Sequence, residues 1–386
     1  MTRPPACRSA FVNAAIMTPQ GPAPDAHVVV EGAIIAAVDS GEPRKADFDD
    51  IIDLGGGVLL PGFIDLQING GGGLLFNDDP STAVARGIAA AHLRFGATRI
   101  FPTLISDDLD KIAAAIAAAD QAAEEGLPGV AGVHIEGPFL NVERRGVHDP
   151  AKLQRLTPAA IELLGSARRA RVLVTLAPEL AEPDDIRRLA ARGVRICAGH
   201  TNATYDEMRR AFELGVSGVT HLFNAMPTML SRAPGAIAAA LESTAWCGII
   251  VDGHHVHPAM LKLAWRAKAD HRFMLVSDAM SVVGADIDHF HLGGRRIEVR
   301  DGACRAEDGT LAGSALGMID AVGNAVSMMG VTLFEASRMA SANPAAFAGL
   351  SDAAGSISPG LAVDFVHVDH QLRFRNAWVG GVKAVA

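Results

Sequence analysis

Residues 55–68 read GGGVLLPGFIDLQI, and the pattern of the chain changes at this stretch. Before it, residues 8–54 alternate short β-rich pieces with turn clusters such as TPQGPAP, a pattern typical of antiparallel strands. After it, short apolar runs alternate with segments of helical length, which indicates repeated βα units around a parallel sheet. The stretch therefore marks the point where a parallel α/β domain begins.

Eight apolar runs follow this pattern, and each is interpreted as a strand. They are VLLPGFIDL (58–66), TRIFPTL (98–104), VAGVHI (130–135), VLVTLA (172–177), VRICAG (194–199), SGVTHL (217–222), CGIIVDG (247–253) and FMLVSD (273–278). The expected helices are 81–95, 107–125, 158–169, 183–192, 203–214, 234–243, 257–269 and 314–329. Eight such units favour a (β/α)8 barrel of the TIM type, and a doubly wound open sheet is the alternative.

The two ends of the chain share a β-rich pattern outside the barrel. We expect residues 1–56 and 356–386 to form one composite β-sandwich domain. The barrel is then expected over 57–355, with a β-hairpin insertion near 286–312, where GG, DG and EDG separate short β-like runs. Because the insertion follows the eighth strand, it is placed to cover the barrel mouth.

Composition and charge exclude several classes of protein. The chain has 386 residues, of which 49% are hydrophobic and 20% charged, so bulk disorder is excluded. A net charge of −9 argues against a nucleic acid partner. The four cysteines form no CxxC pair, and no apolar run reaches the roughly 18 to 20 residues of a membrane span. With no signal-peptide pattern either, we expect a cytoplasmic protein without membrane association.

Polar residues that follow apolar runs in a barrel lie at the carboxyl ends of its strands, where barrel enzymes build their active sites. Here they are Gln67, Asn69, His134, Glu136, His200, His221 and Asp278. One carboxylate and two imidazoles form a ligand set for Zn²⁺ or Fe²⁺. Asp278 is the candidate general base and acid beside such a metal. A salt bridge to Glu136, capping by Asp278 and ordinary hydrogen bonding by the histidines are the alternatives.

Eight motifs in a fixed order resemble the N-acetylglucosamine-6-phosphate deacetylases of the amidohydrolase superfamily. They are PGFIDLQINGGGG (61–73), HIEGPFLN (134–141), RRGVHDP (144–150), AGHTNATY (198–205), THLFNAMPTMLSRAPG (220–235), IIVDGHHVHP (249–258), VSDA (276–279) and GTLAGSALGM (309–318). The resemblance runs nearly end to end and includes GSISPGLAVDF (355–365). It implies metal-dependent hydrolysis of N-acetyl-D-glucosamine 6-phosphate to D-glucosamine 6-phosphate and acetate, a step of amino sugar catabolism.

The resemblance also implies roles for individual residues. The implied metal ligands are Glu136, His200 and His221. Asp278 matches the catalytic aspartate that takes a proton from water and returns it to the leaving amine, and His148 matches a histidine that polarises the acetamide carbonyl. The implied substrate contacts are Asn224, Ala225, Arg232, His255, Leu311, Ala312, Gly313 and Ser314. Arg232 matches an arginine that reaches the phosphate in the neighbouring subunit, so a homodimer is expected.

Two departures from the superfamily pattern bear on the metal and the substrate. Many members carry H-x-H after the first strand, where this chain has Gln67 and Asn69. An amide is a poorer transition-metal ligand than imidazole, so we expect one Zn²⁺ or Fe²⁺ per subunit, with Gln67 holding the ligand shell or a water. Residues 280–282 (Met-Ser-Val) replace a small Ala-Pro-rich loop and bear on substrate range. His254 and His257 are expected to serve solvation or helix capping.

Two other functions stay open from the sequence. The substrate could be N-acetylgalactosamine 6-phosphate or another N-acyl sugar phosphate, because these ligands would use every residue named above. The chain could also be a catalytically inactive barrel with a binding or regulatory role. The presence of all four residues of the expected metal and proton-transfer set argues against the second alternative.

Overall fold

The computed structural model describes residues 7–384, so residues 1–6 and 385–386 of the expected β-domain lie outside the described part. Eight parallel strands form one sheet: β8 (Phe63–Ile68), β11 (Ala97–Ile105), β12 (Gly132–Glu136), β13 (Arg171–Leu176), β14 (Arg195–Ala198), β15 (Val216–Val219), β16 (Trp246–Ile249) and β17 (Phe273–Leu275). A parallel bridge between Ile68 and Ala279 joins the two edges. This closure confirms the (β/α)8 barrel and excludes the open sheet.

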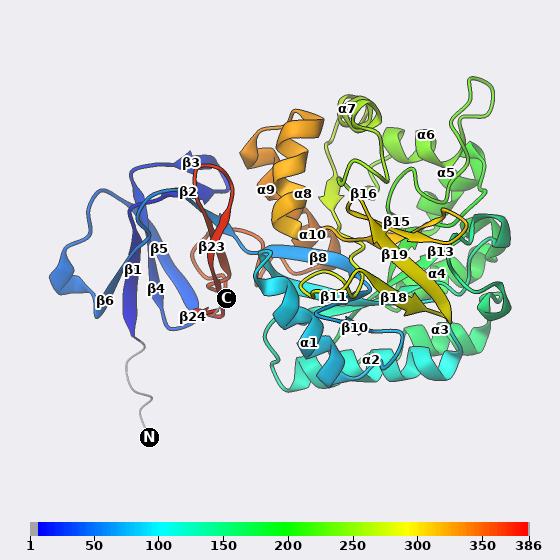
Figure 1. Cartoon of the computed structure of the whole chain (residues 1–386), viewed down its shortest axis with the longest axis horizontal. Helices are drawn as coiled ribbons and strands as arrows, with labels where there is room; N and C mark the ends of the chain where they lie inside the picture. The colour runs from blue at the N-terminus through cyan, green and yellow to red at the C-terminus, as the bar shows by residue number, and fades with distance from the viewer. Residues whose placement is uncertain (1–6, 385–386) are drawn as a thin grey trace.

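Helices surround the barrel (Figure 1). They are α1 (Thr82–Leu93), α2 (Leu109–Glu124), α3 (Pro158–Leu164), α4 (Pro183–Ala191), α5 (Tyr205–Leu214), α6 (Gly235–Glu242), α7 (Pro258–Ala267) and α8 (Met318–Asn324), followed by α9 (Leu333–Ala340) and α10 (Ala342–Ala348). Thr204 and Glu207 form a capping box at the start of α5. The His257 side chain accepts a hydrogen bond from the backbone N–H of Ala259 at the start of α7, which confirms its expected capping role. No described helix is both long and apolar enough to cross a membrane.

The two chain ends pair in a smaller β-domain beside the barrel (Figure 1). One sheet contains β1 (Arg8–Val12), β4 (Ala26–Glu31), β5 (Ile34–Ser40) and β6 (Asp50–Asp53). The other contains β2 (Ala15–Thr18), β3 (Gly21–Ala23), β7 (Val58–Pro61), β22 (Phe365–Val368), β23 (Phe374–Val379) and β24 (Val382–Lys383). Phe11 packs edge-on against Phe365 and Trp378, with ring centroids 5.3 and 5.1 Å away. These contacts bury apolar area between the sheets, as in a sandwich.

The strand expected over 58–66 is divided at Gly62. Residues 58–61 form β7, which pairs with β2 and β22, and only residues 63–68 form the barrel strand β8. A side chain at position 62 would lie 2.2 Å from the hydroxyl oxygen of Thr98, so glycine permits the close approach. The expected domain boundary at residue 57 would assign β7 to the barrel. The strand pairs of β7 are instead formed with β2 and β22 of the sandwich.

The insertion after the eighth barrel strand is larger than the expected hairpin. It is a four-stranded antiparallel sheet of β18 (His289–Leu292), β19 (Arg295–Arg300), β20 (Ala303–Ala306) and β21 (Leu311–Ser314). Figure 1 shows β18 and β19 crossing in front of the barrel strands. The sheet packs on the barrel through a buried apolar cluster that includes Met280, Leu292 and Ile297. The Gly-containing turns predicted the first pair of strands, but the longer meander was not expected.

Candidate active site

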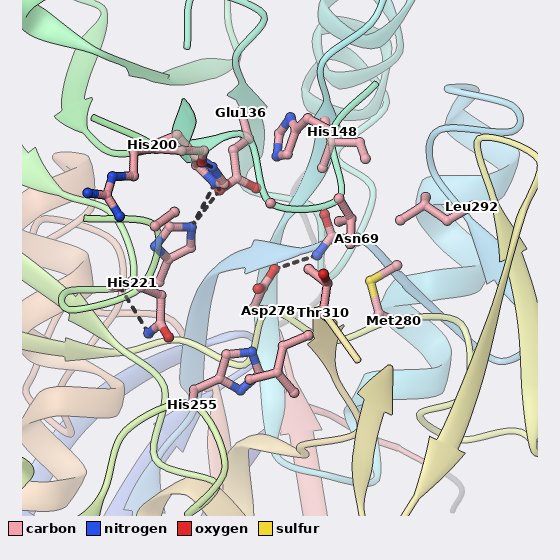
Figure 2. A pocket seen from close by; sticks show the side chains of 18 of the residues that line it. Asn69, Glu136, His148, His200, His221, His255, Asp278, Met280, Leu292 and Thr310 are labelled. Carbon is pink, nitrogen blue, oxygen red and sulfur yellow. Dashed lines mark hydrogen bonds and ion pairs between the residues drawn. The ribbon is translucent and has the colours of Figure 1, made fainter. Parts of the chain in front are cut away.

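A cavity of about 300 Å³ lies where the loops after the barrel strands meet the insertion (Figure 2). We call it the mouth cavity. Eleven of the residues singled out in the sequence line it: Asn69, Glu136, His148, His200, His221, Asn224, Ala225, His255, Asp278, Leu311 and Gly313. The cavity therefore brings together residues from six barrel strands or their loops and from β21.

Glu136, His200 and His221 converge on one point of the mouth cavity. Glu136 ends β12, and the two histidines follow β14 and β15. Glu136 Oε1 lies 3.2 Å from His200 Nε2 and 3.0 Å from His221 Nε2, and the two Nε2 atoms are 3.1 Å apart. Both histidines have positive φ, at 48° and 29°, a conformation that non-glycine residues adopt at an energetic cost. Such strain concentrates at functional sites.

The protonation of these groups fits a divalent cation. His200 Nδ1 lies 2.7 Å from the carbonyl oxygen of Arg144, and only a protonated Nδ1 can donate to it. The Nε2 of a neutral His200 then carries a lone pair directed toward His221 Nε2 and Glu136, which is the arrangement of a metal-ligating histidine with an outer hydrogen bond. Burial opposes ionisation of Glu136, but the close approach of the His200 and His221 imidazoles holds its pKa well below the usual range.

A second grouping of possible ligands overlaps the first. Glu136, His148 and His200 each offer an atom, and the three atoms lie within 4.8 Å of one another. We favour the tighter set with His221, because its three atoms lie 3.0–3.2 Å apart. His148 Nδ1 is also engaged elsewhere, since it lies 2.7 Å from Ser106 Oγ.

Asp278 lies beside this set and is held by two amides. Asn69 Nδ2 donates to Asp278 Oδ1 at 2.6 Å, and Gln67 Nε2 lies 3.2 Å from the same oxygen. Gln67 Nε2 also lies 3.1 and 3.2 Å from the two carboxylate oxygens of Glu136. Burial, followed by the negative charge of Glu136, raises the pKa of Asp278 to about 6. Asp278 can therefore take up and release a proton near neutral pH.

His148 presents a defined tautomer to the mouth cavity. The backbone N–H of Ser106 donates to His148 Nδ1 at 3.3 Å, which makes Nδ1 an acceptor. A neutral imidazole that accepts at Nδ1 carries its proton on Nε2. Burial, and then the electrostatic influence of His200, lower the pKa of His148 to about 3, so the ring stays neutral. His148 is thus prepared to donate one hydrogen bond from Nε2.

His255, Ala225 and Arg144 also line the mouth cavity, and Figure 2 shows His255 at its lower edge. His255 Nδ1 is 2.6 Å from Asp252 Oδ2, and burial of Asp252 is outweighed by the His255 hydrogen bond and charge, which lower its pKa to about 2. Ala225 adopts a positive φ of 52° in the turn after His221. Arg144 contributes a positively charged guanidinium group to the lining of the cavity, and its Nε donates to Asn202 Oδ1 at 2.5 Å.

Some predicted residues lie outside the mouth cavity. Arg232 is exposed, in a turn where Leu230 and Ala233 exchange backbone hydrogen bonds. Ala312 is buried in the apolar cluster beneath the insertion, and Ser314 Oγ donates to the carbonyl oxygen of Ser277. His134 Nε2 lies 2.7 Å from Thr175 Oγ1 inside the barrel, so this histidine is a hydrogen-bonding core residue.

Sequence reasoning missed the positions that support the cavity from its rim. Ser106 directly follows β11, and its contribution comes from its backbone N–H, which residue type does not signal. Arg144 begins the motif RRGVHDP (144–150), in which His148 is the predicted functional residue. Leu292 lines the cavity with an apolar side chain that no local pattern distinguishes, whereas Met280, also in the lining, belongs to the 280–282 loop that the sequence related to substrate range.

A closed barrel with a carboxylate, two imidazoles and an aspartate converging at its carboxyl end defines the class of metal-dependent barrel hydrolases. The chain belongs to the amidohydrolase family, whose model matches residues 58–385.

Named relatives agree with this class. The chain is 42% identical over 327 residues to an N-acetylgalactosamine-6-phosphate deacetylase of Shewanella sp. (strain ANA-3), covering 84% of this chain and 82% of the relative. It is 32% identical over 354 residues to an N-acetylglucosamine-6-phosphate deacetylase of Haemophilus influenzae, covering 91% and 92%. The crystal structure of N-acetylglucosamine-6-phosphate deacetylase from Pasteurella multocida superposes with a TM-score of 0.94 at 35% identity, covering 98% and 100%.

Proposed function

We propose that this protein is a metal-dependent N-acetylglucosamine-6-phosphate deacetylase that releases acetate and D-glucosamine 6-phosphate. One observation carries the proposal: three ligand atoms converge within 3.0–3.2 Å of one another beside Asp278, at the carboxyl end of a barrel. Relatives at 31–42% identity bear the names of amino sugar phosphate deacetylases, which supports the substrate class.

Glu136, His200 and His221 are the proposed ligands of one divalent metal per subunit, Zn²⁺ or Fe²⁺. Such a cation, when bound, lowers the pKa of water toward neutrality and polarises a carbonyl group. A single site is supported by Gln67, whose amide N–H₂ lies 3.1–3.2 Å from oxygens of both Glu136 and Asp278. That amide fills the space between the two carboxylates that a second cation would need.

In amide hydrolysis, Asp278 transfers the proton and His148 stabilises the negative charge that develops on the carbonyl oxygen. Asp278 accepts a proton from the attacking water and then gives it to the nitrogen, so that the amine leaves neutral. A pKa of about 6 suits both steps near neutral pH. His148 donates from Nε2 to the oxygen that gains negative charge, in the tautomer that Ser106 imposes.

The sugar phosphate is proposed to lie toward Asn224, Ala225 and His255, which line the mouth cavity. Arg144 supplies a cation from the same chain, and a guanidinium is suited to phosphate. Arg232 is proposed to reach the phosphate in the neighbouring subunit of a homodimer. Its exposed turn, with Met229 44% and Leu230 59% exposed, supports a surface that a second subunit covers. We further propose a cytoplasmic location.

An acetate-release assay tests the reaction. Purified protein supplied with Zn²⁺ or Fe²⁺ is compared on N-acetylglucosamine 6-phosphate, its galactosamine epimer and unphosphorylated N-acetylglucosamine. We expect release from the phosphorylated sugars only, with the glucosamine epimer preferred. The epimer arm is needed because the Shewanella relative is named for the galactosamine substrate. Absence of acetate from every sugar phosphate with metal supplied would instead support the inactive-barrel alternative.

Subunit sharing has its own test. Subunits with Arg232→Ala are mixed with subunits carrying Asp278→Asn, each inactive or weak alone. If Arg232 serves the partner's site, mixed dimers regain activity, because one of their two sites has both an intact Asp278 and an intact neighbouring arginine. Mixtures no more active than the separate variants would rule the sharing out.

A further inference from the structure

His92 is a fully buried histidine of α1 that the mechanism above does not use. Its Nε2 lies 2.8 Å from the carbonyl oxygen of Gly70, the residue after Asn69. Burial lowers the pKa of His92 to about 4, so the ring is neutral and carries one proton. A carbonyl oxygen can only accept a hydrogen bond, so Nε2 carries that proton and donates to Gly70.

The other ring nitrogen of His92 shows what the histidine contributes. Its Nδ1 is buried and has no hydrogen-bond partner among residues 7–384, which is unfavourable for a polar atom. An apolar side chain of similar size would avoid this cost, so the contribution of His92 is its hydrogen bond to Gly70. Gly71 also lies against the ring, since an added Cβ there would be 2.6 Å from Nε2. Glycine therefore lets the loop pass this close to α1.

The loop that contains Gly70 is joined to the segment after the eighth barrel strand. The backbone N–H groups of Asn69 and Gly70 both donate to the carbonyl oxygen of Ala279, at 2.9 and 3.0 Å. Two further backbone hydrogen bonds of 2.8 Å join residues 72–73 to residues 281–283. The two loops therefore pack as one layer, which carries both Asn69 and the segment that follows the general base.

The end of α1 holds both loops of this layer from outside the mouth cavity. His92 donates to Gly70 in the first loop, and the guanidinium group of Arg94 donates to the carbonyl oxygen of Gly284 at the end of the second. Figure 1 shows α1 outside the barrel strands, beside β10 (Leu74–Leu75). Neither His92 nor Arg94 is among the described residues that line the cavity, so neither is placed to touch substrate.

We propose that His92 is a positioning residue for proton transfer: through Gly70 it fixes Asn69, and through Asn69 it sets the orientation of the Asp278 carboxylate. This inference rests on the proposed function. Asn69 Nδ2 lies 2.6 Å from Asp278 Oδ1, so a small displacement of the loop lengthens this hydrogen bond beyond its useful range. Removal of the His92 donor releases Gly70 from α1 and permits such a displacement. A misplacement of about 1 Å in an active site can cost about 10²-fold in rate.

The test measures kcat, KM and metal content for acetate release from N-acetylglucosamine 6-phosphate. His92→Leu keeps an apolar volume but has no donor, and we expect kcat to fall about 10- to 100-fold with KM within about threefold of wild type. His92→Gln replaces Nε2 by an amide N–H₂ and should bring kcat back to within about fivefold of wild type. His367→Leu is the matched control, because His367 in the sandwich is also buried, bonds Gly56 through Nε2 at 2.8 Å and leaves Nδ1 without a partner among the described residues. It should keep the wild-type kcat.

A double variant shows whether His92 acts through Asn69. If it does, His92→Leu combined with Asn69→Ala should have a kcat within about threefold of Asn69→Ala alone, because the second change finds the path already broken. Losses that multiply in the double variant would overturn the inference. So would a His92→Leu protein whose kcat stays within about twofold of wild type.

The outcomes also separate this inference from the proposed function. Active wild type with an unaffected His92→Leu variant overturns the positioning role and leaves deacetylation intact. Wild-type protein that releases no acetate from any sugar phosphate overturns the proposed function and the inference together. Should His92→Leu fail to fold, His92→Asn takes its place, because its shorter side chain also withdraws the donor from Gly70, and the same outcomes apply.

Discussion

Replacement of Asn69 by alanine should move the acid limb of the pH–rate profile upward. Asn69 Nδ2 donates to Asp278 Oδ1 at 2.6 Å, a short hydrogen bond to a buried carboxyl group. This bond stabilises the ionised form, so its loss raises the pKa of Asp278. A hydrogen bond to a charged group is worth about 1.5–3 kcal/mol, and one pKa unit corresponds to about 1.4 kcal/mol. Gln67 still reaches the same oxygen at 3.2 Å, so we expect a shift near the lower end, about one unit.

The shift translates into a rate difference that depends on pH. Because Asp278 must be ionised to accept a proton, activity is lost as pH falls through its pKa. A rise from about 6 to about 7 lowers the ionised fraction about twofold at pH 7 and about tenfold at pH 5. A cation bound beside Asp278 lowers the pKa in both proteins, so the prediction concerns the difference between them.

The assay is kcat/KM for acetate release from about pH 4.5 to 9, with metal content measured in each protein. Asn77→Ala is the matched control, because Asn77 exchanges two hydrogen bonds with the backbone of Ile105 and has no bond to Asp278. It should keep the wild-type acid limb. An Asn69→Ala profile that superposes on wild type, with equal metal content, would refute the assigned control of Asp278 by this amide.

Three further predictions concern proton transfer, the histidine tautomer and stability. Asp278→Asn should lower kcat by about 10²- to 10⁴-fold with near-normal metal content, and retention of wild-type turnover would contradict its role. Ser106→Ala keeps the backbone N–H that fixes the His148 tautomer, so kcat should fall less than about tenfold. His148→Ala removes the donor itself and should lower kcat by about 10²-fold or more. Equal losses of kcat in the two variants would contradict the assignment of the tautomer to the backbone N–H. Arg99→Ala breaks a 2.7 Å ion pair with the buried Asp364, and the free energy of unfolding in urea should drop by about 2 kcal/mol.

The barrel could be predicted because its signal is repeated. Each strand is a short apolar run with a helix-length segment after it, and each of the eight runs overlaps a barrel strand. The pairing of strands in the tertiary structure, which hydrophobic periodicity does not reveal, determined where the first barrel strand begins. Residues 58–61 and 63–68 form one continuous apolar run, and the break comes from Gly62 packing against Thr98 and from β7 pairing with β22 across the whole chain. No local pattern records a partner some three hundred residues away.

The candidate site was predictable where polar side chains interrupt apolar runs. Burial of a carboxylate or imidazole is costly, so Glu136, His200 and His221 stand out in the sequence, and the structure brings them together. The residues that support the site, such as Ser106, are not distinguished in the sequence by an unusual residue type. Ser106 contributes its backbone N–H, which every residue type except proline has, and Leu292 lines the cavity with an apolar side chain like many others in the chain. Such roles depend on three-dimensional position rather than on residue type.

The two amides after the first barrel strand also tune the proton chemistry. The negative charge of Glu136 contributes to the raised pKa of Asp278, and Gln67 lies between their oxygens as a neutral donor. A second cation in that place would neutralise the repulsion fully and drive the pKa of Asp278 down, which would make it a poor acid for the leaving amine. Amides neutralise it only in part and leave the pKa at about 6, where one group can both accept and return a proton near neutral pH. Replacement of imidazoles by Gln67 and Asn69 is therefore consistent with a working one-metal site rather than with a lost one.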